Sequence, residues 1–273
     1  MSIAKKALCV ALLALSSVAA QAGAIRFASE FTDFTLPRND DGSTGLVDIG
    51  FSINFFGVNR TQLFVNNNGN VTLDSALPTY TPFPLANTNR QILAPFFADV
   101  DTRNTGSNVV QYGTGTVDGR SAFGVNWQMV GYYNSQANKL NSFQLILIDR
   151  SDTGAGNFDF EFNFDQIQWE TGTASGGTNG LGGNSARMGW SNGALNTFEL
   201  AGSAVNGAFL DNGANALIHN SLGSDVDGRY RWQVRNGTVT TPPSDVSEPA
   251  TLAIVGLGLM GAGLASRRRR KAA

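Results

Sequence analysis

The stretch Phe158-Asp159-Phe160-Glu161-Phe162-Asn163-Phe164-Asp165 decides the fold class. Its four phenylalanines alternate with acidic and amide side chains, and successive side chains of a β-strand point to opposite faces. Helical spacing would scatter the same phenylalanines around the helix. The stretch therefore predicts a half-buried antiparallel strand over 158–169, in which each buried aromatic side chain stabilises the fold by ~1.5–3 kcal/mol.

Short segments with the same period of two, separated by turn residues, flank this strand. Turns are expected at 66–69 and 118–119, where Asn-Gly and Asp-Gly pairs tolerate a positive φ. Residues 142–149 are apolar on both faces and predict a central strand, while Pro95 predicts an edge, a bend or a bulge in the apolar run 91–101. The pattern favours an all-β, antiparallel β-sandwich-like single domain. The other expected strands are 51–55, 62–65, 71–73, 109–112, 121–130, 187–190, 196–200 and 228–235, and 171–184 is expected to be a long mobile loop.

Charge is distributed unevenly along the chain. Residues 23–249 hold 12 of the 19 basic residues and all 21 acidic ones, which gives this part a net charge of −9. Phosphate binding needs a basic surface, so nucleic acid is excluded as a partner, while a divalent cation or a neutral glycan stays compatible. The one cysteine, Cys9, lies in the N-terminal apolar run. The remaining chain therefore has neither a disulfide framework nor a thiol nucleophile.

Residues 1–22 have the three parts of a secretory signal peptide. Two lysines open the segment, an apolar run too short to span a membrane follows, and Ala20 and Ala22 are small residues suited to cleavage before Gly23. We therefore expect the Sec translocon to export the chain, so that residues from 23 onward work outside the cytoplasm.

The C-terminal end has three parts as well. Ser247-Glu248-Pro249 precedes an uncharged apolar helix over 250–265, and a basic cluster stops it. Sixteen helical residues span about 24 Å, somewhat less than the ~30 Å hydrocarbon core, although arginines extend the reach by snorkelling. The alternative to a sorting signal is a plain C-terminal membrane anchor. The basic residues are Arg267, Arg268, Arg269, Arg270 and Lys271.

This tail, over 247–271, resembles the PEP-CTERM sorting signal of Gram-negative bacteria, with Ser247 in place of the first proline. The resemblance implies an inner-membrane precursor with its basic end in the cytoplasm. It also implies recognition by exosortase, a membrane protease-transferase that acts near the motif. The mature protein is then expected at the cell surface or outside the cell.

Several motifs between the two ends occur in the order typical of the nidogen-like (NIDO) domain. The resemblance covers about 51–203, within a domain expected over 23–238 and followed by a proline-containing linker over 239–246. In animals this domain occurs in extracellular matrix and adhesion proteins without a known catalytic role, so it implies adhesion or matrix association. The motifs are Phe55-Phe56-Gly57, Leu63-Phe64-Val65-Asn66-Asn67-Asn68-Gly69, Ile92 to Asp101 with its Ala-Pro-Phe-Phe-Ala-Asp-Val-Asp run, Asn141-Ser142-Phe143-Gln144, Ile167-Gln168-Trp169-Glu170 and Ala186-Arg187-Met188-Gly189-Trp190.

Asp99 and Asp101 are candidate site residues, because they lie two apart at the end of a predicted strand. One interpretation is a calcium site, since calcium binds several oxygen ligands. The other is that both carboxylates cap a turn by accepting backbone N–H groups. A third, weaker interpretation makes them the acid and base of a glycosidase.

Aromatic and histidine side chains supply the remaining candidates. Tyr132 and Tyr133 end a predicted strand and are candidate glycan contacts, whereas Trp127 and Trp232 share faces with apolar residues and are expected in the core. His219 is the one histidine of the chain, and without cysteines it suits neither a zinc site nor a catalytic triad. No catalytic residue and no confident metal ligand is assigned.

The leading functional hypothesis is a non-enzymatic exported surface or extracellular matrix protein, associated with adhesion, exopolysaccharide or biofilm. Exosortase, exopolysaccharide and matrix proteins are its expected partners. The alternatives are a glycan-binding module and, less favoured, a carbohydrate-active enzyme.

Overall fold

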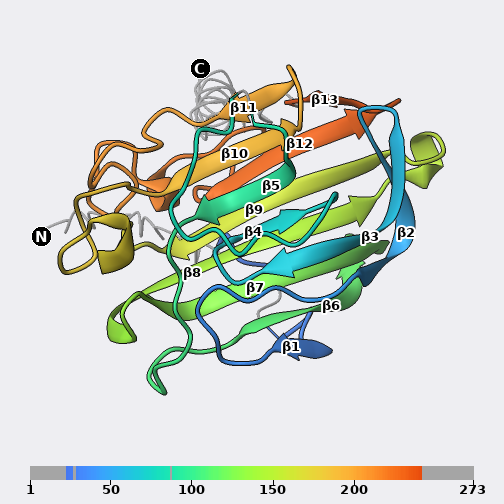
Figure 1. The fold of residues 1–273 in the computed structure, drawn as a ribbon. Helices are drawn as coiled ribbons and strands as arrows, with labels where there is room; N and C mark the ends of the chain where they lie inside the picture. Colours follow the sequence, from blue (N-terminus) through green and yellow to red (C-terminus); the bar gives the residue numbers. More distant parts are fainter. Residues whose placement is uncertain (1–22, 27–28, 87, 242–273) are drawn as a thin grey trace, which may run out of the picture.

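The computed structural model describes residues 23–26, 29–86 and 88–241. These residues form two antiparallel β-sheets that lie face to face, with three short 3₁₀ turns and no α-helix among them (Figure 1). The predicted all-β sandwich is confirmed for this part of the chain. The predicted signal peptide at 1–22 and the sorting tail at 247–271 lie outside the described residues. Across the described ranges, no helix has the length and apolar character that crossing a membrane requires.

The larger sheet contains seven strands in the order β1-β6-β7-β8-β9-β12-β13. Its middle is a meander of four consecutive strands, β6 to β9, in which the longest connection covers 150–157 and contains a 3₁₀ turn. The expected turn at Asp118-Gly119 joins β6 to β7, and both residues have positive φ. The strands are β1 (Phe34–Leu36), β6 (Val110–Val117), β7 (Arg120–Tyr132), β8 (Gln136–Asp149), β9 (Phe158–Gln166), β12 (Arg229–Arg235) and β13 (Thr238–Thr240).

The smaller sheet contains six strands in the order β11-β10-β5-β4-β3-β2. Strands β2 to β5 follow one another along this sheet, and the chain returns to it from the larger sheet with β10 and β11. The expected hairpin around Asn66-Asn67-Asn68-Gly69 is confirmed as the turn between β3 and β4. The strands are β2 (Val47–Phe55), β3 (Val58–Asn66), β4 (Asn70–Thr72), β5 (Gln91–Phe97), β10 (Arg187–Asn192) and β11 (Thr197–Glu199).

Aromatic side chains fill the space between the sheets. Phe96 of β5 packs against Phe143 of β8 with ring centroids 5.3 Å apart, and Phe198 of β11 lies 5.5 Å from Trp232 of β12. Trp127 of β7 also packs in this core, as predicted for it and Trp232. The apolar faces of the two sheets thus bury each other.

The opposite face of β9 is buried as well, which corrects the prediction of a half-buried strand. Asp159, Glu161 and Asn163 are each 0 % exposed, and arginines cover the two carboxylates. Arg231 approaches Asp159 Oδ2 to 2.7 Å and Arg26 approaches Glu161 Oε2 to 2.7 Å. The alternation of residues in β9 predicts correctly which face is apolar and which is polar. The polar face, however, is covered by a layer of ion pairs with arginines and is not exposed to solvent. The strand also ends at Gln166, before Trp169.

Two β-bulges change the direction of side chains in the sheets. On β5 the register with β10 shifts between Ala94 and Phe97, which places Pro95 at a bulge, one of the predicted positions for a residue without an N–H. On β7 the register shifts between Trp127 and Val130, where Met129 has a φ of 53°. This bulge turns Met129 outward, to 40 % exposure.

Two segments differ from their sequence-based description. The predicted mobile loop over 171–184 is a loop, but it contains a 3₁₀ turn at Thr173–Ser175 and backbone hydrogen bonds such as Thr178 N–H to Leu181 O at 2.7 Å. The linker predicted over 239–246 begins later, because Thr238–Thr240 pairs with β12 as β13. The last strand therefore belongs to the folded domain.

Candidate functional site

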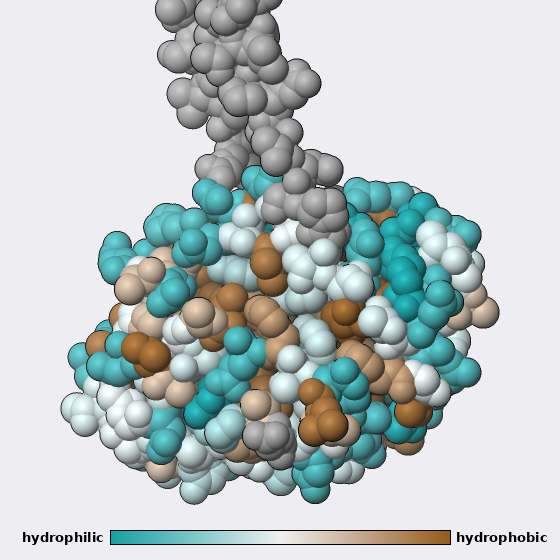
Figure 2. All heavy atoms as spheres, turned by 90° about the horizontal axis from the view of Figure 1, so that it is seen from above, coloured by the Kyte–Doolittle hydropathy of each residue, from teal (hydrophilic) through white to brown (hydrophobic). Residues whose placement is uncertain are grey.

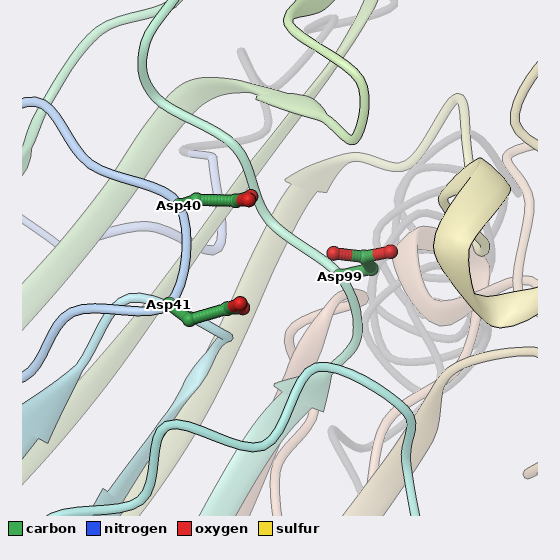
Figure 3. A group of neighbouring side chains, drawn as sticks. All are labelled: Asp40, Asp41 and Asp99. Carbon is green, nitrogen blue, oxygen red and sulfur yellow. The ribbon is translucent and has the colours of Figure 1, made fainter.

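Three carboxylates from distant parts of the chain meet at one end of the smaller sheet. Asp40 and Asp41 lie in the segment between β1 and β2, and Asp99 lies two residues after the end of β5 at Phe97. Oxygen atoms of the three carboxylates lie within 4.8 Å of one another. In Figure 3 the carboxylates of Asp40 and Asp41 point toward the segment that carries Asp99. We refer to these three residues as the acidic site.

The β3–β4 turn holds the segment that carries Asp40 and Asp41. Asn67 donates its backbone N–H to Gly42 O at 2.9 Å and its side-chain amide to Asp40 O. Asn68 donates Nδ2 to Asp41 Oδ1 at 2.8 Å. The turn that the sequence predicts thus fixes two of the three carboxylates.

A glycine in this turn allows β5 to come close. Gly69 has a φ of 72°, and a Cβ there would overlap the carbonyl oxygen of Phe96. The Phe96 N–H donates to Gly69 O at 3.1 Å, and the Ala98 N–H donates to Asn68 O at 3.3 Å. These bonds hold the chain just before Asp99 against the turn.

Asp99 is buried without a hydrogen-bond partner. Its exposure is 1 %, and neither carboxylate oxygen accepts a hydrogen bond from the described residues. The nearby Ser175 hydroxyl lies 3.0 Å from Thr81 Oγ1, a contact in which either oxygen can be the donor. Gly172 approaches from the other side, where a Cβ would overlap Asp99 Oδ2. A buried carboxylate in this state is uncommon, because buried polar atoms normally have partners.

Crowding of like charges shifts the acidity of the acidic site. Burial raises the pKa of Asp99 to about 7. The neighbouring charges of Asp40, Asp41 and Asp101 add to the rise, and the nearby Ser175 hydroxyl opposes it. Burial and the charges of Asp101 and Asp41 raise the pKa of Asp40 to about 6, and burial also raises the pKa of Asp41. The geometry therefore favours a positive charge among these carboxylates, either protons or a cation.

The structure separates Asp101 from the acidic site and gives it the turn-capping arrangement. Its Oδ1 accepts the Arg103 N–H at 2.9 Å and its Oδ2 accepts the Ser135 N–H at 2.7 Å, and the Arg103 guanidinium pairs with the carboxylate. Burial alone would raise the pKa of Asp101, but these hydrogen bonds outweigh it and hold the pKa below its usual range. Arg103 also lies 3.2 Å from Asp40 Oδ2.

The two tyrosines occupy different environments. Tyr132 is 1 % exposed, its ring packs 5.4 Å from that of Trp169, and its hydroxyl donates to Asn138 Oδ1 at 3.0 Å. The prediction of Tyr132 as a glycan contact is therefore wrong, because a bulge-bearing β7 carries its last side chain into the core. Tyr133 is half-buried, and the Arg103 guanidinium lies 5.5 Å from its ring centroid. His219 is exposed at the end of a 3₁₀ turn.

Sequence reasoning missed Asp40 and Asp41. The run Asn39-Asp40-Asp41-Gly42-Ser43 has the composition of an ordinary turn, and nothing in its spacing points to a residue near position 99. The available signal was the acidic pair itself. It indicates a site only when the β3–β4 turn is known to lie beside it.

Comparison with known proteins gives the family. The model of the nidogen-like domain matches residues 61–236, which is more than half of the chain. The chain belongs to the nidogen-like (NIDO) domain family. This NIDO chain also matches the PEP-CTERM protein-sorting motif over residues 245–270, a range that includes Ser247, Glu248 and Pro249. Asp99 lies inside the matched NIDO region, whereas Asp40 and Asp41 precede it.

The curated relatives are much longer animal proteins. Alpha-tectorin of Mus musculus is 35 % identical over 197 residues, which cover 63 % of this chain and 9 % of the relative. Alpha-tectorin of Gallus gallus is 32 % identical over 223 residues, covering 72 % of this chain and 10 % of the relative. Nidogen of Drosophila melanogaster is 29 % identical over 137 residues, covering 41 % of this chain and 10 % of the relative. The chain thus spans about a tenth of the length of these relatives, and no solved structure matches it significantly.

Proposed function

We propose that this chain is a non-enzymatic protein of the bacterial surface or extracellular matrix, associated with adhesion or with exopolysaccharide in a biofilm. The observation that carries the proposal is the presence of a NIDO domain and a PEP-CTERM motif in one chain. The motif match begins at residue 245, shortly after β13 ends at Thr240. The motif therefore follows a folded domain.

The order of segments gives a route to the surface. Residues 1–22 direct the chain to the Sec translocon, and the tail holds the precursor in the inner membrane with Arg267 to Lys271 in the cytoplasm. Ser247-Glu248-Pro249 then lies just outside the membrane, within reach of exosortase. Processing there releases the domain or transfers it to another molecule.

The surface and the charges support a binding role rather than catalysis or nucleic-acid binding. Asp101 is engaged with Arg103, so it is poorly suited to act with Asp99 as an acid–base pair. On the face seen from above in Figure 1, apolar and polar residues are interspersed (Figure 2), a composition that non-obligate protein interfaces share with protein surfaces in general. The partners proposed for this binding role are matrix proteins and exopolysaccharide.

Two variants test the sorting claim in the native host. Deleting 248–271 should change how the protein is distributed among the inner membrane, the envelope and the medium. It should not lower the melting temperature of the domain. Replacing Ser247, Glu248 and Pro249 together with alanine keeps the apolar helix and the basic stop, so uncut precursor should accumulate in the inner membrane.

A plain membrane anchor predicts a different outcome. The triple alanine variant would then fractionate as the wild type does, and mass spectrometry of the mature C-terminus would find residues beyond Pro249. Either result would refute exosortase-type processing. The surface role itself is tested by comparing cell adhesion and exopolysaccharide retention between the wild type and a strain without the protein, where equal values would contradict the proposal.

A further inference from the structure

We propose that Asp40, Asp41 and Asp99 bind a calcium ion that ties the segment before β2 to the end of β5. The proposal is independent of how the tail is processed. The pair Asp99 and Asp101 is one sequence-based interpretation of a calcium site. Here the site instead comprises residues of two distant segments, which the β3–β4 turn joins.

Several buried oxygen atoms at the acidic site have no hydrogen-bond partner among the described residues. Asp99 is 99 % buried and neither of its oxygens accepts a hydrogen bond from the described residues. Asp40 Oδ1 and Asn68 Oδ1 are also buried without a hydrogen bond there, and the Asn68 amide contacts Asp41 at 2.8 Å. Leaving such atoms unsatisfied destabilises the fold, most of all where the group is charged. A shared ligand at this position would satisfy several of them at once.

The charge balance also indicates a cation. Three carboxylates converge, and the cation that touches one of them, Arg103, lies 3.2 Å from Asp40 Oδ2 and is shared with Asp101. A proton could neutralise one carboxylate, but it would satisfy a single pair of oxygens. A divalent ion can contact an oxygen of each carboxylate together with an amide oxygen.

The chemistry of the ligands selects calcium among divalent ions. Carboxylate and amide oxygens suit hard cations, and the acidic site contains neither histidine nor cysteine. Calcium accepts six to eight oxygen ligands in flexible geometry, whereas magnesium requires a near-ideal octahedron and retains water. Ligands that come from separate segments fit the more tolerant ion. We expect an affinity in the range of about 10⁻⁴–10⁻³ M, which is typical of extracellular modules.

The test uses the purified full chain in detergent, stripped with EGTA. Isothermal titration with calcium chloride should give binding to one site per chain, and calcium should raise the melting temperature relative to EGTA. Asp99→Asn should weaken calcium binding by at least about tenfold, a loss that is seen even for outer-shell residues of metal sites. Because Asp99→Asn also removes a repelling buried charge, its melting temperature in EGTA should equal or exceed that of the wild type.

Asp225→Asn is the matched control, because Asp225 is exposed and makes no hydrogen bond or ion pair with the described residues. It should keep the calcium response of the wild type. Asp41→Asn, at a less buried carboxylate, serves as a second variant if Asp99→Asn does not fold. Absence of calcium binding at millimolar concentration, unchanged affinity in the folded variant, or an equal or larger shift with magnesium chloride would each overturn the proposal.

Discussion

Gly172 is a residue without a side chain that packs directly against the buried carboxylate of Asp99. It lies in the loop after β9 and approaches Asp99 so closely that a Cβ would overlap Asp99 Oδ2 and press on the Cβ of Tyr133, 2.8 Å away. The φ of Gly172 is −82°, a value open to any residue, so space rather than backbone conformation requires glycine here. A Cβ at Gly69 would likewise overlap a neighbouring atom, the carbonyl oxygen of Phe96.

We expect Gly172→Ala to destabilise the domain by ~1–3 kcal/mol, because an added methyl group in a packed region forces neighbouring atoms to shift. The free energy of unfolding in urea measures the effect. Gly45→Ala is the control, since no atom lies within 4 Å of a Cβ at that position. Equal unfolding energies for the two variants would show that the space around Asp99 is not restrictive.

Among the strands, β9 makes structural contacts through both of its faces. Its phenylalanines fill the core between the sheets, and its carboxylates form the ion-pair layer on the outer face of the larger sheet. Asp159 receives three arginines, with Arg150 at 2.9 Å, Arg231 at 2.7 Å and Arg235 at 2.7 Å. These arginines come from the β8–β9 connection and from β12, so one carboxylate joins three parts of the chain.

Replacing Asp159 with alanine should remove the counter-ion that three arginines share, although Arg150 keeps its contact with Asp152 at 3.1 Å. Removing one partner of a buried ion pair typically costs 3–5 kcal/mol, and we expect about 3 kcal/mol because these arginines are partly exposed. Chemical denaturation measures the loss. Asp165→Ala on the same segment removes an exposed carboxylate that accepts one N–H, from Ile25 at 3.1 Å, and should cost less than about 1 kcal/mol. Similar losses for the two variants would contradict a structural role for the ion-pair layer.

At the scale of the whole molecule, the boundary between the domain and its tail lies after β13. Three residue pairs join β13 to β12, and Val239 packs against the core. The Phe56 N–H donates to Gly237 O at 2.9 Å, so the β12–β13 turn also contacts the smaller sheet. The sorting motif therefore follows a complete sandwich, and the processing proposed at 247–249 would leave β13 in place.

A chain that ends at Gly237 should unfold more readily than one that ends at Thr241. The shorter chain loses the apolar contact of Val239 and the pairing of β13, which we expect to lower stability by about 1–2 kcal/mol. Thermal unfolding of both truncated chains measures the difference. Identical melting temperatures would place the end of the domain before β13, as the linker predicted over 239–246 implies.

The strand periodicity, the main turns and the family can be predicted from local patterns in the sequence. Alternating phenylalanines, Asn-Gly and Asp-Gly pairs and the Ala-Pro-Phe-Phe-Ala-Asp-Val-Asp run are local patterns, and local patterns report backbone geometry and the apolar face of a strand. The order of the NIDO motifs and the PEP-CTERM tail is likewise readable along the chain.

Tertiary structure alone decided which polar residues are buried and which of them meet. Asp159 and Asp165 look alike in the sequence, yet arginines from β12 and the β8–β9 connection cover one and not the other. Asp101 lies two residues from Asp99, yet it turns to Arg103, while Asp40 and Asp41 reach Asp99 across nearly sixty residues. The physical reason is that the partner of a side chain at a strand end depends on which strands and loops lie beside it. The order of strands in the sheet sets those neighbours, and it depends on long-range contacts that local sequence spacing does not record.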